Sequence, residues 1–276
     1  MVPQGSIEHI ITHLTKQGYA LSVIDTYILR LLGTPKSGWI SLGKNQLNRI
    51  DFLYKLTNAK AMIHKVTLIP GETKELFLEA VSKQLDLNKT KLLHYYHQYS
   101  VYPEAGIYAD TYHVPYGIGE KHLIAFLTKI SEKKYQSLSE KIYGTYNKKR
   151  WSKILTIASI IQKEAANNQE MPLISSVIVN RLKKGMRLQM DGTLNYGKYS
   201  HTKVTPERIK NDKSDFNTYK HKGLPSSPIG SVSLSAIKAA IKPAKTNYLY
   251  FMKNNKGVHD FTDTFKKHRI NIQKSR

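Results

Sequence analysis

Glu164 is the residue whose type and setting are best suited to acid–base chemistry. It follows Ile157 and Ile160 at helical spacing, so all three should share one face of an apolar helix. A carboxyl group on such a face loses hydration in its charged form, and its pKa should therefore rise. We expect Glu164 to be protonated near neutral pH and able to give a proton to a leaving oxygen. The alternative is a glutamate at a helix end that reaches water or pairs with a lysine.

The element that must position Glu164 is a helix from Trp151 to about Asn167. Its apolar residues lie nearly all round the helix, which predicts a central, buried position. Pro172 should begin the next helix and Gly185 should end it. Residues 186–190 alternate apolar and polar side chains, which predicts a half-buried strand that is broken at Asp191.

The remainder of the second half combines a long loop with short elements. We expect a helix at residues 234–241, which Pro243 stops, and a β-hairpin formed by residues 248–252 and 258–262. A terminal helix should carry His268. The sequence therefore predicts an α+β fold for this half, with its polar residues concentrated in loops.

Three Pro/Gly turns mark the first half of the chain, at residues 2–6, 69–73 and 114–117. Each begins at an apolar residue that ends an extended piece, and each precedes a helical pattern. Ser6 and Thr73 are the expected caps of the first two helices. Strand, turn and capped helix form a small α/β unit like those of LysM glycan-binding modules, so we predict a LysM-like N-terminal subdomain.

Three further elements are expected in the first half. Ser22 should cap a helix that ends at Gly33. Its inward-facing residues should be Ile24, Ile28, Leu31 and Leu32. A second amphipathic helix should span residues 45–58, followed by a strand at 64–69.

The polar, lysine-rich stretch 131–150 is the best candidate for a domain boundary, which predicts two regions, 1–150 and 151–276.

Composition narrows the classes of function. The 276 residues include 43 Lys plus Arg against 20 Asp plus Glu, a formal charge of +23, which attracts nucleic acid, anionic membrane or a carboxylate-bearing polymer. The lysines form no arm or stripe, which disfavours nucleic acid. The absence of cysteine excludes disulfides, a thiolate zinc site and a cysteine nucleophile. The sequence contains no run of about 18 apolar residues, the length that would predict a membrane-spanning helix.

The segment from Leu155 to Glu164 resembles the catalytic helix of the YceG-like family, the MltG-type endolytic murein transglycosylases. In that family the last glutamate of a Glu-Lys-Glu run is catalytic, and here Gln162 replaces the first. The resemblance continues in order through 179–196, 217–229, 239–244 and 248–268. A second departure is Gly192, which stands where the family usually has proline.

This resemblance implies that Glu164 protonates the oxygen between N-acetylmuramic acid (MurNAc) and N-acetylglucosamine (GlcNAc), then removes the proton of the C6 hydroxyl of MurNAc. The product would be a 1,6-anhydro sugar, formed without water and without a cofactor or metal. Residues at matching positions, which are expected to bind substrate, are Gln189, Asp191, Asn217 and Tyr219. Asp191 could instead be a turn residue, and Asn217 could hydrogen-bond to the loop backbone.

The family resemblance also implies a cellular location and binding partners. Peptidoglycan lies outside the cytoplasmic membrane, so we expect a protein at its extracytoplasmic, periplasmic face. An N-terminal transmembrane helix outside this sequence would anchor it there. The expected substrates are nascent glycan strands of peptidoglycan, and the expected partners are the synthases that make them.

Other functions remain open from the sequence. A hydrolytic muramidase could pair Glu164 with Asp191 or Asp215, since most glycosidases use two carboxyl groups. A non-catalytic peptidoglycan-binding protein would instead depend on the LysM-like units. A nucleic-acid binder is the third alternative.

Overall fold

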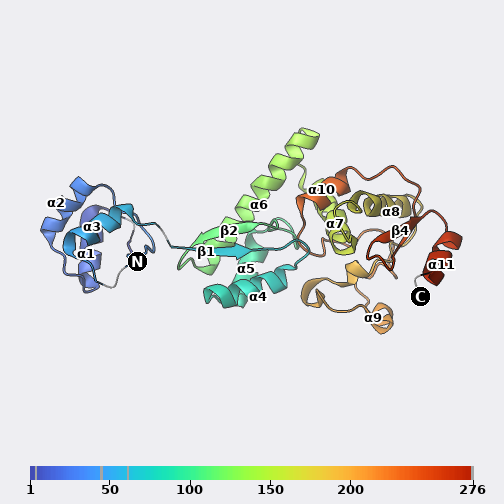
Figure 1. Ribbon diagram of the computed structural model, residues 1–276, viewed down its shortest axis with the longest axis horizontal. Helices are drawn as coiled ribbons and strands as arrows, with labels where there is room; N and C mark the ends of the chain where they lie inside the picture. The colour runs from blue at the N-terminus through green and yellow to red at the C-terminus, as the bar shows by residue number, and fades with distance from the viewer. Residues whose placement is uncertain (4, 44–45, 61, 275–276) are drawn as a thin grey trace. The chain divides into compact units, whose positions relative to one another are not determined.

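The computed structural model describes residues 1–3, 5–43, 46–60 and 62–274, and it combines helices with two small sheets (Figure 1). This confirms the predicted α+β class. The chain forms two compact units: Met1–Val66 with Tyr112–Gly119, and Thr67–Thr111 with Glu120–Arg276. The predicted functional boundary at residue 150 stays a prediction. Gln4 of the first predicted turn and residue 45, the predicted start of a helix, lie outside the described residues.

The first unit contains the helices α1 (Ile7–Lys16), α2 (Val23–Leu32) and α3 (Arg49–Asn58) (Figure 1). Ser6 caps α1 as predicted, because its hydroxyl accepts a hydrogen bond of 3.2 Å from the backbone N–H of His9. α3 begins at Arg49, where Asn48 supplies the cap. The buried apolar side chains from these helices are Ile10, Ile11, Leu14, Leu29, Phe52, Leu53 and Leu56.

The predicted inward face of α2 is confirmed for Ile28 and Leu32, which are half-buried and pack against the core of this unit, and is wrong for Ile24 and Leu31. Ile24 is 66% exposed and Leu31 is 90% exposed, whereas Asp25 and Leu29 are fully buried. The cause is an ion pair: both carboxylate oxygens of Asp25 accept from the Arg49 guanidinium, at 2.6 and 2.5 Å. Asp25 also accepts from the backbone N–H of Ser22, at 2.5 Å. A buried charge needs such partners, so Asp25 faces α3, and Ile24 and Leu31 face solvent.

Strand β1 (Ile63–Thr67) pairs with β2 (Thr111–Pro115). β1 confirms the strand predicted near residues 64–69. The Pro70-Gly71 turn and helix α4 (Lys74–Leu85) follow it in the predicted order. Thr73 precedes α4, but its hydroxyl donates to the carbonyl of Gly197 over 2.9 Å, so its side chain does not cap the helix.

The second unit holds the remaining helices. They are α4, α5 (Lys89–Tyr99), α6 (Glu120–Tyr143), α7 (Lys148–Glu164), α8 (Met171–Lys183), α9 (Pro206–Asn211), α10 (Leu234–Ile241) and α11 (Phe265–Lys274). Two short 3-10 turns, η1 (Asp191–Leu194) and η2 (Gly197–Tyr199), lie between α8 and α9. Within the described residues, no helix is both long and apolar enough to cross a membrane.

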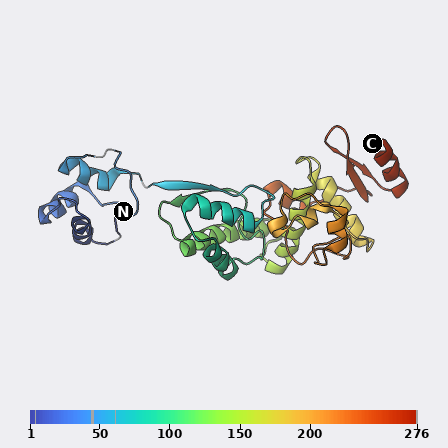
Figure 2. The same ribbon diagram turned by 90° about the horizontal axis from the view of Figure 1, so that it is seen from below.

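The hairpin predicted near the C-terminus is confirmed. Strands β3 (Tyr250–Lys253) and β4 (His259–Thr262) are antiparallel, with Tyr250 opposite Thr262 and Lys253 opposite His259. α11 follows the hairpin directly and lies beside it (Figure 2). The ring of His268 stacks on Tyr250 at a centroid distance of 5.3 Å.

The strand predicted at residues 186–190 does not form. Leu188 and Met190 are buried in the expected alternation, but Gln189 has a left-handed φ of 49° and the segment joins no sheet. Its partner is a loop: the N–H of Gln189 donates to the Thr218 carbonyl, and that of Met190 to the Thr218 hydroxyl.

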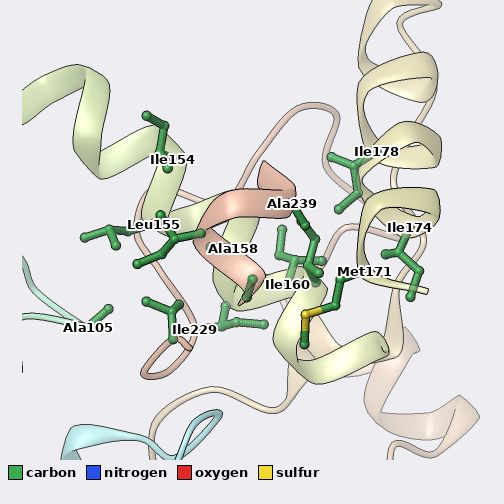
Figure 3. Packing of buried hydrophobic residues seen from close by; sticks show 14 of the residues in the cluster. Ala105, Ile154, Leu155, Ala158, Ile160, Met171, Ile174, Ile178, Ile229 and Ala239 are labelled. Atoms are coloured by element: carbon green, nitrogen blue, oxygen red, sulfur yellow. The ribbon is translucent and has the colours of Figure 1, made fainter. Parts of the chain in front are cut away.

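α7 is the central helix of the second unit, as predicted. Its side chains Trp151, Leu155, Ala158 and Ile160 are fully buried. Side chains of α8 and α10 meet those of α7 around Ile160 (Figure 3). The end of α7, where Glu164 lies, is therefore held by packing from two other helices.

Candidate active site

Glu164 is the last residue of α7, and its side chain is half-buried. The helix ends there because Ala165 adopts an extended conformation, with ψ of 131°. Oε1 of Glu164 accepts a hydrogen bond of 2.7 Å from the backbone N–H of Gly192 in η1. The 3-10 turn η1 therefore lies directly against the carboxyl group.

The pKa of Glu164 is shifted in the direction that the sequence predicts. Burial raises the pKa of Glu164 to about 7, while the Gly192 N–H opposes this rise, the Asp191 charge adds to it and the Arg181 charge opposes it. A carboxyl group with a pKa near neutrality can give a proton and take one back under the same conditions. Those are the two steps that a general acid and base must perform.

Asp191 and Tyr219 lie together beside this carboxyl group. The Tyr219 hydroxyl donates to Oδ1 of Asp191 over 2.7 Å. Burial, the Asp191 carboxylate and the Glu164 charge raise the pKa of Tyr219, so its hydroxyl stays protonated and remains a donor. Asp191 is exposed and begins η1, so it serves as a turn residue and also accepts from Tyr219.

Asn217 has the alternative role that the sequence left open. It is fully buried, and its amide nitrogen donates to the carbonyls of Ile209 and Asp212, at 2.8 Å each. Its Oδ1 accepts from the Tyr219 N–H at 3.2 Å. Asn217 thus holds the loop that presents Tyr219, and its expected contact with substrate stays a prediction. Gln189, by contrast, is exposed at its left-handed position.

Two groups at this site were missed from the sequence. The Gly192 N–H is a backbone donor, which residue type cannot reveal. Arg181 was noted only as part of a matching segment. Its buried guanidinium donates from Nε to the Leu249 carbonyl over 2.6 Å and from Nη1 to the Leu188 carbonyl. The signal in the sequence for Arg181 was its place at the end of a predicted helix, just before the alternating apolar residues of 186–190.

Gln162, where the family has its first glutamate, has a structural contact. Its Oε1 accepts from the N–H of Ser233 at 3.2 Å, and Ser233 is the N-cap of α10. A neutral amide performs this role without a buried charge. The side chain of Gln162 therefore joins α7 to the start of α10.

A second carboxyl group with a raised pKa lies elsewhere in the same unit. Burial raises the pKa of Glu104 to about 8, with Glu75 adding to the rise. Glu104 accepts from the N–H of Lys74, the first residue of α4, at 3.0 Å. The cavity that it lines has a volume of about 10 Å³, which is too small for a sugar. Glu104 is thus a buried cap of α4.

The described ranges contain no group of three or more His, Asp or Glu residues that could hold a metal ion. The site consists of one half-buried carboxyl group, a backbone donor, a buried arginine and a Tyr–Asp pair.

Comparison with known proteins gives the family. A model described as the YceG-like family matches residues 1–274. The chain belongs to the YceG-like family. The crystal structure of a protein from Listeria monocytogenes that is described as putative YceG-like is similar to this chain, with a TM-score of 0.66 and 25% sequence identity. The match covers 98% of this chain and 96% of that one.

Two curated relatives of this family member are named endolytic murein transglycosylase. The Bacillus subtilis protein is 42% identical over 123 residues, which is 44% of this chain and 34% of the relative. The Streptococcus pneumoniae D39 protein is 36% identical over 117 residues, 40% of this chain and 21% of the relative. The aligned segments thus span about a third or less of the length of these relatives.

Proposed function

We propose that this family member is an endolytic lytic transglycosylase of peptidoglycan. It cleaves the β-1,4 bond between MurNAc and GlcNAc and leaves 1,6-anhydroMurNAc ends. The observation that supports this most is a carboxyl group with a pKa near 7, Glu164, on the helix that carries the family resemblance. The names of the two relatives support the same reaction class.

The proposed reaction needs one carboxyl group. Neutral Glu164 gives its proton to the glycosidic oxygen as the bond from that oxygen to C1 of MurNAc breaks. The 2-acetamido group stabilises the positive charge that develops at C1. The C6 hydroxyl of the same sugar then bonds to C1 and its proton passes to the Glu164 carboxylate. The acid is regenerated and no water is consumed.

Three exposed or half-buried groups are suited to hold the sugars beside Glu164. The Asp191 carboxylate and the Tyr219 hydroxyl can hydrogen-bond sugar hydroxyls and acetamido groups. Gln189, two residues before Asp191, presents an exposed amide that can do the same. Asn217 acts indirectly, because its amide fixes the backbone at Tyr219.

The N-terminal region has a proposed binding role. β1, the Pro70-Gly71 turn and α4 follow one another in the order expected of a LysM-like unit, and we assign residues 1–150 to glycan binding and 151–276 to catalysis. The substrate is proposed to be nascent glycan at the extracytoplasmic face of the membrane. Anchoring by an N-terminal transmembrane helix and association with peptidoglycan synthases belong to the same proposal.

The test is digestion of uncrosslinked glycan in water enriched in oxygen-18, with products identified by mass. A lytic transglycosylase gives anhydro ends that are one water lighter than reducing ends and contain no oxygen-18. A hydrolytic muramidase incorporates one labelled oxygen at each cut, and a binding protein gives no cut. Labelled reducing ends, or intact glycan, would each refute the proposal.

A further inference from the structure

The backbone amide of Gly192 contacts only one of the two oxygens of Glu164. Its N–H donates to Oε1 over 2.7 Å, and Gly192 itself is buried within η1. In a neutral carboxyl group, the carbonyl oxygen accepts a hydrogen bond while the other oxygen carries the proton. A fixed donor at Oε1 therefore favours the form in which Oε2 is protonated.

We propose that Gly192 is a positioning residue of the acid, whose N–H reserves Oε1 as the acceptor and so makes Oε2 the oxygen that gives its proton to the substrate. This inference rests on the proposed function, in which Glu164 is the acid.

The same hydrogen bond favours the charge that forms during the reaction. Once Oε2 has lost its proton, the Gly192 N–H donates to a carboxylate, and such charge-assisted bonds are stronger than neutral ones. A donor that is already in place stabilises that charge without reorganisation. Three charged or titratable groups also act on Glu164: Asp191 disfavours its carboxylate, Arg181 favours it and the Tyr219 hydroxyl lies within electrostatic reach.

A side chain at position 192 would disturb this contact. The φ of Gly192 is not in the left-handed region, so no backbone conformation requires glycine. A Cβ at position 192 would lie 2.8 Å from Oε1 of Glu164 and 2.8 Å from Cβ of Lys163. Either η1 or the carboxyl group would have to move. Alanine at this position therefore separates the N–H from Oε1, and proline, the usual residue of the family here, has no N–H to donate, so the proposed role belongs to chains with glycine at this position.

The first experiment compares Gly192→Ala with Gly119→Ala and Glu164→Gln. Gly119 is the matched control, because a Cβ there meets nothing within 4 Å and no positive φ is involved. For Gly192→Ala we expect kcat to fall at least about tenfold, the order seen when a donor to reacting charge is lost, with KM unchanged. The fall of kcat/KM on the alkaline side should move to higher pH, because the carboxylate has lost a donor. Gly119→Ala should match wild type.

The outcomes separate the two proposals. If Glu164→Gln is inactive but Gly192→Ala keeps the wild-type rate and pH profile, the role of Gly192 is refuted and the acid stands. If Glu164→Gln retains activity, the proposed function fails.

A second measurement does not require Gly192→Ala to fold. In wild-type protein labelled with nitrogen-15 glycine, the Gly192 amide proton should shift downfield as the pH rises through the titration of Glu164, and this shift should vanish in Glu164→Gln. A Gly192 amide that does not titrate in wild type would overturn the inference.

Discussion

The Tyr219 hydroxyl donates to Oδ1 of Asp191 over 2.7 Å, and this bond joins the loop after α9 to the turn η1 that contacts Glu164. Tyr219 is a neutral donor, since its pKa is raised, so it orients Asp191 without adding a charge. The negative charge of Asp191 in turn helps to keep the pKa of Glu164 high, after burial, the larger cause. Tyr219 thus acts on the acid through Asp191.

Tyr219→Phe tests this relationship. It removes the hydroxyl and leaves the ring, so Asp191 loses its orienting donor. We expect kcat/KM to fall about tenfold, the size of a lost hydrogen bond to a charged group. Tyr199→Phe is the matched control, at an exposed tyrosine whose ring lies 4.0 Å from the Arg208 guanidinium. Equal kcat/KM for Tyr219→Phe and wild type would show that the Asp191 bond is irrelevant.

The raised pKa of Glu164 predicts a pH-dependent stability. Between pH 4.5 and about 7 the folded protein keeps a proton that the unfolded chain has lost, so the free energy of unfolding falls as the pH rises through this window. Glu164→Gln cannot ionise. It should therefore gain about 3 kcal/mol over wild type between pH 4 and pH 8, which is the free energy of a pKa raised from 4.5 to about 7.

Urea unfolding at both pH values measures this difference, with Glu207→Gln as the control at an exposed glutamate. A Glu164→Gln protein that follows wild type at both pH values would show that the carboxyl group is not desolvated.

Asn217→Ala distinguishes a structural role from a substrate contact. The variant loses two buried donors to the carbonyls of Ile209 and Asp212. We expect the free energy of unfolding to fall by about 2 kcal/mol, since two half-buried carbonyls lose their donor. A substrate contact would instead raise KM and leave the stability unchanged, and that pattern would contradict our interpretation.

Glu170 holds the chain just after Glu164. Its Oε2 pairs with Nδ1 of His259 at 2.7 Å and accepts from the Ala166 N–H at 3.2 Å; Glu170 is buried and His259 is half-buried. Burial alone would raise the pKa of Glu170, but the bonds to His259 and Ala166 outweigh it and lower the pKa. This carboxylate therefore stabilises the fold above its ordinary pKa, and the contribution is lost as the pH falls through the lowered value.

For Glu170→Gln we expect a loss of about 2 kcal/mol at pH 7, the size of a lost hydrogen bond to a charged group, and a smaller loss below pH 4. Thermal unfolding of both proteins across this range provides the measurement. A loss that is equal at all pH values would show that the charge of Glu170 plays no part.

Much of the second unit could be predicted because its signals are local. Apolar residues round α7, Pro172 at the start of α8 and Pro243 after α10 set these helices from neighbouring residues alone. The hairpin of β3 and β4 follows from two short strands and a turn. The setting of Glu164 followed in the same way, from its place at the end of an apolar helix.

The errors came from partners that are distant in the sequence. The face of α2 is set by Arg49, which lies 24 residues from Asp25 and pairs with it. Residues 186–190 have strand alternation, but their hydrogen bonds go to Thr218 in a loop. Gly192 acts through its backbone and through the absence of a Cβ, neither of which a residue type or a spacing can reveal.

The most direct test of the central claim is the rate at which purified wild type and Glu164→Gln cut nascent, uncrosslinked glycan at pH 6. Glutamine has nearly the same shape as glutamic acid but has no proton to give. We predict that Glu164→Gln binds the glycan and cuts it at least about a thousandfold more slowly, within the range for loss of a general acid. Cleavage within tenfold of the wild-type rate, with the same anhydro ends, would contradict the assignment of Glu164 as the acid.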